Sequence, residues 1–174
     1  MEPSSFAQTL VNSSGGNPVS SLVDIVHNNL VNQQDWTRMR VHDAASSKFP
    51  RMLLSGLPPR RLYIHPDEQI EVLRAERKLG NGQRIAQPPE LEWIMPMHLA
   101  ETPTVSLLAA VFDSISAVPP TDEIEEIKDD SAAEEWKAWR SSRRGKRLLL
   151  AVVQDDSSVT YYFMHDGIVK PRQN

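Results

Sequence analysis

Histidine is the natural place to look for acid–base chemistry, because its unperturbed pKa lies near neutrality. The chain has five, His27, His42, His65, His98 and His165. His27 falls in a helical pattern, His42 precedes a polar link and His65 lies at a predicted helix start. His98 lies in a predicted loop, and His165 ends the last predicted strand. No pattern supplies a second group that would orient one of them as a base. We therefore predict surface or capping roles for all five, and no catalytic residue in this chain.

The sequence contains no recognisable motif for binding a metal or a cofactor. The histidine spacings do not form a zinc-binding H-E-x-x-H pair. The acidic run from Thr121 to Glu135 lacks the alternating oxygen ligands and central glycine of a calcium loop. Cysteine is absent from the sequence, which excludes thiolate ligands and disulfides and fits a reducing compartment. We predict neither a metal nor a cofactor.

A cluster of cations is the remaining candidate for ligand binding. Five lie within eight positions: Arg140, Arg143, Arg144, Lys146 and Arg147. Such side chains neutralise phosphates, so Arg143, Arg144, Lys146 and Arg147 are predicted RNA contacts. The favoured alternative is a solvated helix end that neutralises the acids at 129–135. The formal net charge of -4 argues against gripping nucleic acid by overall charge, so any RNA contact would be local.

Length and composition predict one soluble domain. The chain has 174 residues, of which 40% are hydrophobic, enough for one core. No apolar stretch approaches the roughly 20 residues needed to span a bilayer, so we expect no membrane association. Residues 1–18, rich in Ser, Asn and Gly, predict a flexible arm. The domain would cover 19–174, with an acidic insertion near 119–132.

Periodicity predicts three helices ahead of the C-terminal region. Apolar residues at helical spacing begin at Leu22 and end near residues 32–34. Pro66 suits the first turn of a second helix, which Gly80 or Gly82 would stop. The residues expected to face inward are Ile70, Val72 and Leu73. Thr104 caps the third, which carries a broad apolar stripe from Val105 to Ile115.

Short strands are predicted between these helices. They cover residues 36–42, 51–54, 61–64 and 91–95, the last interrupted by Pro96. Gly56, followed by two prolines, is expected to form a turn. Strands mixed with helices in this way predict an α+β domain with a mixed sheet flanked by helices.

The C-terminal region predicts a β-hairpin. Residues 148–153 form an unbroken apolar run, typical of a strand buried on both faces, and 154–158 have the composition of a turn. The second strand alternates two faces and, near the terminus, would lie at a sheet edge open to strand addition. We predict a partner interface made by Val159, Thr160, Tyr161, Tyr162, Phe163 and Met164. An equally weighted alternative places both faces in the chain's own core.

The terminal run GKRLLLAVVQDDSSVTYYFMHDGIVKP resembles the C-terminal end of the tRNA-splicing endonuclease family. The tail HDGIVKPRQN and the upstream runs SGLPPRRLYIHPDEQ and EWIMPMHLAETPTVSLLAAVFDSI narrow the resemblance to Sen-fifteen-type subunits of the eukaryotic, fungal enzyme. The resemblance extends from Trp36 onward. It implies the compact tRNA-intron endonuclease-like domain.

The resemblance also bears on catalysis. Enzymes of this family cleave RNA through a Tyr, a His and a Lys, and their catalytic His belongs to a His-Gly motif. Lys146 stands where the family's catalytic lysine stands, but no histidine here is followed by glycine. The resemblance therefore implies a non-catalytic structural subunit. The alternatives are an active RNA endonuclease and a stand-alone homodimeric interaction domain.

Partners and location follow from the same resemblance. It implies that the last strand pairs with a catalytic Sen-thirty-four-type subunit, alongside other endonuclease subunits, in a tetramer that acts on precursor tRNA. An acidic loop, here Asp155 and Asp156, would insert into a basic pocket of a neighbouring subunit. The expected location is the nucleus, or the mitochondrial outer surface in some fungi.

Overall fold

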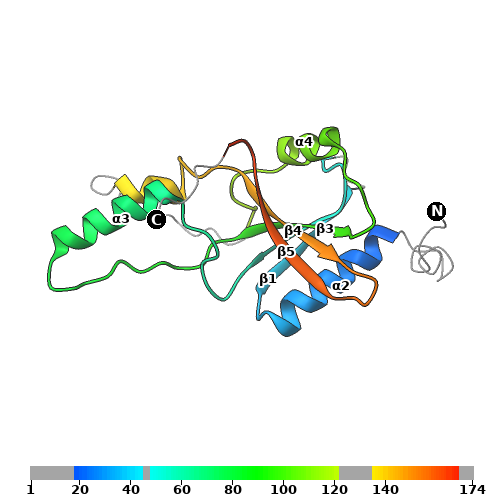
Figure 1. The fold of residues 1–174 in the computed structure, drawn as a ribbon, viewed down its shortest axis with the longest axis horizontal. Helices are drawn as coiled ribbons and strands as arrows, with labels where there is room; N and C mark the ends of the chain where they lie inside the picture. Colours follow the sequence, from blue (N-terminus) through cyan, green and yellow to red (C-terminus); the bar gives the residue numbers. More distant parts are fainter. Residues whose placement is uncertain (1–17, 45–47, 122–134, 169–174) are drawn as a thin grey trace.

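Five strands form one mixed sheet, in the order β1-β2-β3-β4-β5 (Figure 1). The computed structural model describes residues 18–44, 48–121 and 135–168. The strands are β1 Thr37–His42, β2 Leu53–Leu57, β3 Glu92–His98, β4 Arg147–Val153 and β5 Val159–His165. β3 and β4 run parallel, and the other neighbours are antiparallel. The predicted α+β class with a mixed sheet is confirmed; the predicted arm and most of the acidic insertion lie outside the described residues.

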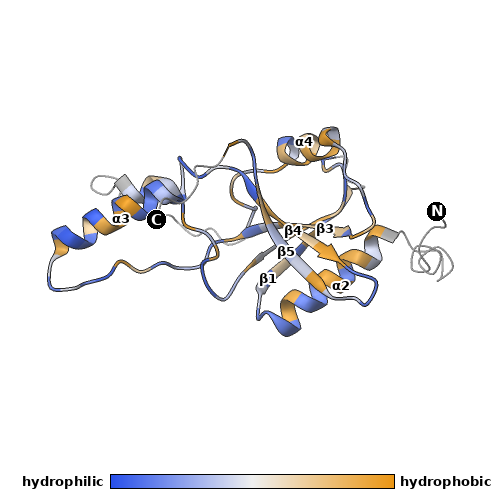
Figure 2. Cartoon of the chain, viewed as in Figure 1, coloured by the Kyte–Doolittle hydropathy of each residue, from blue (hydrophilic) through white to orange (hydrophobic). Residues whose placement is uncertain are grey.

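The predicted C-terminal hairpin is present as β4 and β5. Their register runs from Arg147 opposite His165 to Val153 opposite Val159. β4 is buried along almost its whole length, as an unbroken apolar run requires, and Figure 2 shows it as hydrophobic. β5 pairs only with β4 and so forms one edge of the sheet.

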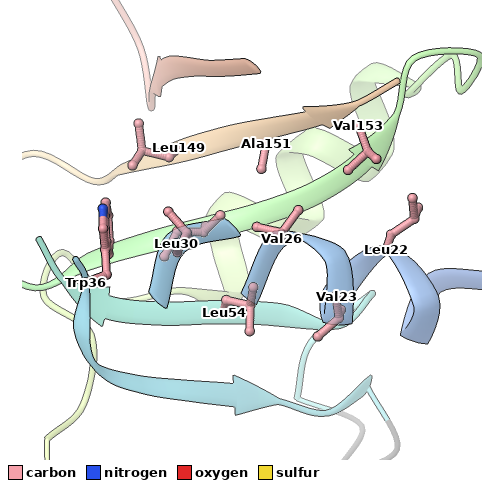
Figure 3. Close-up of a cluster of buried hydrophobic side chains, with 10 residues drawn as sticks. Leu22, Val23, Val26, Leu30, Trp36, Leu54, Leu149, Ala151 and Val153 are labelled. Atoms are coloured by element: carbon pink, nitrogen blue, oxygen red, sulfur yellow. The ribbon is translucent and has the colours of Figure 1, made fainter. Parts of the chain in front are cut away.

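Helix α2 (Pro18–Gln33) covers one face of the sheet. Its apolar stripe packs against alternate residues of the central strands, which is the arrangement in Figure 3. The buried members of this cluster are Leu22, Val23, Val26, Leu30, Trp36, Leu54, Ile94, Leu149, Ala151 and Val153. The predicted first helix is confirmed, and its core-facing side is the predicted one.

Helix α4 (Val105–Ser114) covers the opposite face. The Thr104 side chain accepts a hydrogen bond from the backbone N–H of Leu107, which confirms the predicted cap. Val111 and Phe112 are buried against Trp93 and other residues of the second face of β3 and β4. The alternation within each central strand thus sends one set of side chains to α2 and the other to α4.

Helix α3 (Pro66–Leu79) and the short 3-10 helix η2 (Glu135–Arg140) lie beside each other, away from the sheet (Figure 1). Pro66 begins α3 and Gly80 ends it, as predicted. Of the residues predicted to face inward, Val72 is buried, but Ile70 and Leu73 are each 45% exposed and that part of the prediction is wrong. Glu68 is the other buried residue of α3, because α3 meets the rest of the chain largely through charged groups.

Three strand predictions also need correction. Pro96 does not interrupt β3, since the pairing with β2 covers only residues 92–94 and leaves Pro96 beyond it, where no N–H is needed on that side. Gly56 is not in a turn but within β2, where a Cβ would meet the side chains of Met39 and Trp36. Residues 61–64 form no strand. No helix in the described ranges is long and apolar enough to cross a membrane.

Candidate partner interface

The outer side of β5 is the candidate interface, because no other described strand pairs with it. An edge strand presents backbone N–H and C=O groups that a strand of another chain can take up. β5 is seven residues long and partly exposed throughout. It is therefore long enough to offer a continuous ladder.

The inner face of β5 belongs to the chain's own core. Val159, Tyr161 and Phe163 pack against the α2 cluster. The Tyr161 hydroxyl donates to Oδ1 of Asn29 in α2 at 2.6 Å. Burial raises the pKa of Tyr161 well above its usual value. Three of the six predicted interface residues thus hold α2 and β5 together.

The other face of β5 is divided between core and solvent. Met164 packs against the α4 cluster, whereas Thr160 is exposed. Tyr162 is 56% exposed, the largest aromatic exposure on β5. An exposed tyrosine on an open edge gives a large contact area at low entropic cost, so Tyr162 is the side chain of this interface best placed to meet a partner.

The loop between β4 and β5 holds the two predicted acidic residues in different ways. Asp155 is 62% exposed, and its Oδ1 lies 3.1 Å from Nε2 of His98 at the end of β3. Asp156 accepts a hydrogen bond from the Ser158 backbone N–H at 2.9 Å. The hydrogen bonds from the Ser158 side chain and backbone lower the pKa of Asp156. Asp156 is therefore positioned within the loop itself, and Asp155 by its contact with the end of β3.

A buried ion network occupies the region where RNA contacts were predicted. It joins four arginines, Arg61, Arg140, Arg144 and Arg147, to three glutamates, Glu68, Glu90 and Glu92. The side chains of Arg144 and Arg147 are only 2% and 6% exposed. Arg144 Nη1 lies 2.8 Å from Glu90, and Arg147 Nε lies 3.0 Å from Glu92. This geometry argues against phosphate contacts by Arg144 and Arg147.

The network perturbs its own arginines in opposite directions. Burial lowers the pKa of Arg144, and the neighbouring Arg147 adds to this effect. Burial acts in the same sense on Arg147, but hydrogen bonds and attraction from Glu92 and Glu90 outweigh it and raise the pKa of Arg147. Both guanidinium groups remain charged, and the carboxylates compensate that charge.

The two other predicted RNA contacts are also engaged within the chain. Arg143 lies 3.6 Å from Glu71 and beside the Trp139 ring, with a half-exposed side chain. Lys146 Nζ donates to the backbone carbonyl of Phe112 at 2.8 Å, near the end of α4. The acids at 129–134, which the alternative invoked, lie outside the described residues. RNA contact by Arg143 and Lys146 stays a prediction.

Sequence reasoning missed this network, although one signal was present. Glu92 begins a strand in which every residue is buried, and a glutamate in such a position requires a cation. Arg147 begins the parallel neighbour of that strand. Charged residues at the starts of two apolar strands could therefore have indicated the pair.

Four of the five histidines, His42, His65, His98 and His165, make contacts within the chain. His42 contacts Ser55 Oγ at 2.8 Å and packs beside Trp93. His65 accepts from Asp67 N as the cap of α3 and stacks on Trp139. His98 was predicted to lie in a loop, but it is the last residue of β3 and is buried, because β3 continues past Pro96; its Nδ1 accepts from Ala100 N.

His165 and Tyr63 are in aromatic contact. Their rings lie 4.8 Å apart, between centroids. Burial raises the pKa of Tyr63 and lowers that of His165, and their tilted rings pack with Phe163. This is an aromatic contact and not a hydrogen-bonded pair. No group of three potential metal ligands occurs in the described ranges.

The fold is a single α+β domain with a partly exposed edge strand, β5, and an acidic loop next to it. Residues 25–174 match the sequence profile of the Sen15 protein family. The chain belongs to this family.

Curated relatives agree with the profile match. The chain is 52% identical over 165 residues to a probable tRNA-splicing endonuclease subunit, tsp-1, of Neurospora crassa, covering 95% of this chain and 71% of the relative. It is 27% identical to a probable tRNA-splicing endonuclease subunit, sen15, of Schizosaccharomyces pombe, covering 91% and 86%. It is 24% identical to the tRNA-splicing endonuclease subunit SEN15 of Eremothecium gossypii, covering 90% and 93%. The predicted family is confirmed.

Proposed function

We propose that this chain is a non-catalytic structural subunit of the tRNA-splicing endonuclease, the complex that recognises precursor tRNA and cleaves it at intron splice sites. Its family and its relatives' names support membership of the complex. The observation that carries the structural role is β5, whose outer edge meets no other described strand and which exposes Tyr162. The other subunits of the complex are its partners, and its location is the nucleus.

The proposed contact is strand addition between β5 and the equivalent strand of the catalytic Sen-thirty-four-type subunit. The backbone edge would supply the ladder, and Tyr162 and Thr160 the side-chain contacts. The loop with Asp155 and Asp156 would then meet a basic pocket of a further subunit and help to build a heterotetramer. Charges at such a contact select the partner and its orientation more than they add affinity.

A substitution at Tyr162 tests this interface. We expect Tyr162→Asp to abolish co-purification with the catalytic subunit, because a carboxylate would be buried against the partner. Val41→Asp is the matched control, since Val41 is 50% exposed and lies on the opposite edge strand, β1. Equal loss with both variants, or retention of the partner by Tyr162→Asp, would reject the β5 interface.

The same Tyr162→Asp variant, examined by a second measurement, addresses the homodimer alternative. The molar mass of the isolated chain, measured by light scattering, distinguishes a monomer from a stable dimer. The proposal would be rejected if the wild type formed a dimer that Tyr162→Asp dissociates and also captured no catalytic subunit. The chain would then be a homodimeric interaction domain.

Lys146 tests the non-catalytic role. Its amine is committed to the Phe112 carbonyl, so Lys146→Ala is expected to leave precursor cleavage by the reassembled complex within about twofold of wild type, apart from a small loss of stability from one hydrogen bond. A fall of several orders of magnitude in the cleavage rate, with assembly intact, would make this chain an enzyme.

A further inference from the structure

The far end of α3 carries cations that the ion network does not use. They are Arg74, Arg77 and Lys78 in the last turns of the helix and Arg84 beyond the turn at 80–82. All four are exposed. The C-terminal end of α3 points away from the sheet and from β5 (Figure 1), and it is hydrophilic in Figure 2. We call these four residues the basic tip.

The acids nearest in sequence to the basic tip are engaged elsewhere. Glu76 accepts a hydrogen bond from the Ile85 backbone N–H at 2.9 Å. Glu71 accepts from Trp139 Nε1 and pairs with Arg143. The structure records ion pairs for Arg61, Arg140, Arg144 and Arg147, but none between the basic tip and a described carboxylate. Its charge is therefore uncompensated within the described part of the chain.

Helix geometry places the tip cations at a regular spacing. Arg74 is three residues from Arg77 and four from Lys78, which brings their Cβ atoms within about 5–6 Å of one another. Gly80 and Gly82 both have φ of 68°, and a Cβ at either position would meet open space. The Ile85 backbone N–H, next to Arg84, donates to the Glu76 side chain, which holds the segment of Arg84 beside the last turns of α3.

We propose that the basic tip is a docking site for the phosphate backbone of RNA and that it binds RNA independently of the base sequence. This inference rests on the proposed function only for the identity of the RNA, precursor tRNA. Closely spaced cations suit a polyanion whose negative charges recur at regular intervals, such as a phosphate backbone. The guanidinium group of arginine can donate two parallel hydrogen bonds to phosphate oxygens. The exposed side chains of Ile70 and Leu73 lie on the preceding turns of α3 and are not part of the phosphate contact.

The test measures binding of the isolated chain to an intron-containing precursor tRNA by fluorescence anisotropy, over a series of salt concentrations. The tip variant combines Arg74→Gln, Arg77→Gln and Lys78→Gln, which keep good helix formers in place. The control combines Lys48→Gln, Arg60→Gln and Lys137→Gln, three exposed cations at dispersed positions. The two variants therefore lose the same formal charge.

We expect the tip variant to bind at least about tenfold more weakly, with the slope of log affinity against log salt reduced by about 2 to 3, because each phosphate contact contributes about 0.9. The dispersed control should change affinity by less than about twofold. Equal weakening by both variants would show a mere net-charge effect and overturn the site, as would binding that does not depend on salt.

Two further outcomes separate this proposal from its rivals. If the tip variant and an Ile70→Gln, Leu73→Gln variant both lose a partner subunit while RNA binding is unchanged, the end of α3 binds an acidic protein and the RNA site is rejected. Tyr162→Asp provides the other separation. If it leaves RNA binding by the isolated chain intact but fails to release the catalytic subunit, the β5 interface fails and the basic tip stands.

Discussion

Apolar side chains hold the sheet to α2 and α4, whereas charged side chains connect α3 and η2 to the starts of β3 and β4. The first region buries residues such as Val26, Ile94 and Val111 completely. The second has few apolar contacts, chiefly Val72 and Trp136, beside its buried arginines and glutamates.

The difference lies in how each region responds to the loss of one group. Removing a methyl group from an apolar core leaves a small cavity, and the cost follows its volume. Removing one partner of a buried ion pair leaves a charge without compensation, which costs more although the intact pair adds little net stability. A single substitution should therefore lower the free energy of unfolding more in the ion-paired region than in the apolar core.

The largest effect is expected at Glu92. Glu92→Ala leaves Arg147 and Arg144 without a main carboxylate partner, so the free energy of unfolding should fall by about 3–5 kcal/mol. Ile94→Val, two residues along the same strand, should cost only about 0.5–1.5 kcal/mol. Chemical denaturation of the two variants measures both values, and a smaller loss for Glu92→Ala than for Ile94→Val would reverse the comparison.

An intermediate effect is expected from pH. Burial, with help from Arg40 and Lys48, lowers the pKa of His42, and burial with Arg147 and His65 lowers that of His165, both from 6.5. The unfolded chain then binds protons at a higher pH than the folded chain, so stability is full above about pH 6.5 and falls as the pH drops toward the folded pKa values. Replacing both histidines by glutamine should flatten the slope of unfolding free energy against pH in this window. An unchanged slope would assign the loss to other groups.

The smallest effect is expected on the outer face of α3. Leu73→Gln should change the free energy of unfolding by no more than about 0.5 kcal/mol, because Leu73 is 45% exposed. Val72→Gln, at the neighbouring buried position, should be clearly destabilising, since it places an amide among apolar groups. If thermal melts give the opposite order, Leu73 and not Val72 would be the residue of α3 that packs inward.

These contrasts also explain what the sequence could predict. The periodicity around Leu22 and the apolar run of β4 located α2 and the hairpin, because both elements are held by apolar burial. For α3 the same rule chose Val72, which is buried, but also Ile70 and Leu73, which are not. A hydrophobic pattern does not register a buried glutamate such as Glu68. Charge pairing between distant segments has no period, so a hydrophobic pattern cannot reveal it.

The candidate site was predictable to a similar degree. The alternation of β5 correctly separated Tyr161 from Tyr162, but it did not indicate which of the two faces the core. That assignment depends on α2, which supplies Asn29 from the other end of the domain. The predicted RNA contacts at Arg144 and Arg147 have buried side chains for a related reason: their carboxylate partners lie in a loop and a strand more than fifty positions earlier.

The hydrogen bond between Asn29 and Tyr161 spans 132 positions of the chain, and it has a consequence for folding during synthesis. The apolar side of α2 is made early by the ribosome, but its partners in β4 and β5 are made near the end. Contacts of such high sequence separation form late and slowly. β2 and β3 can cover part of this side earlier, but the part that faces β4 and β5 stays uncovered in the nascent chain until the hairpin emerges, and in that interval the chain is most in need of a chaperone.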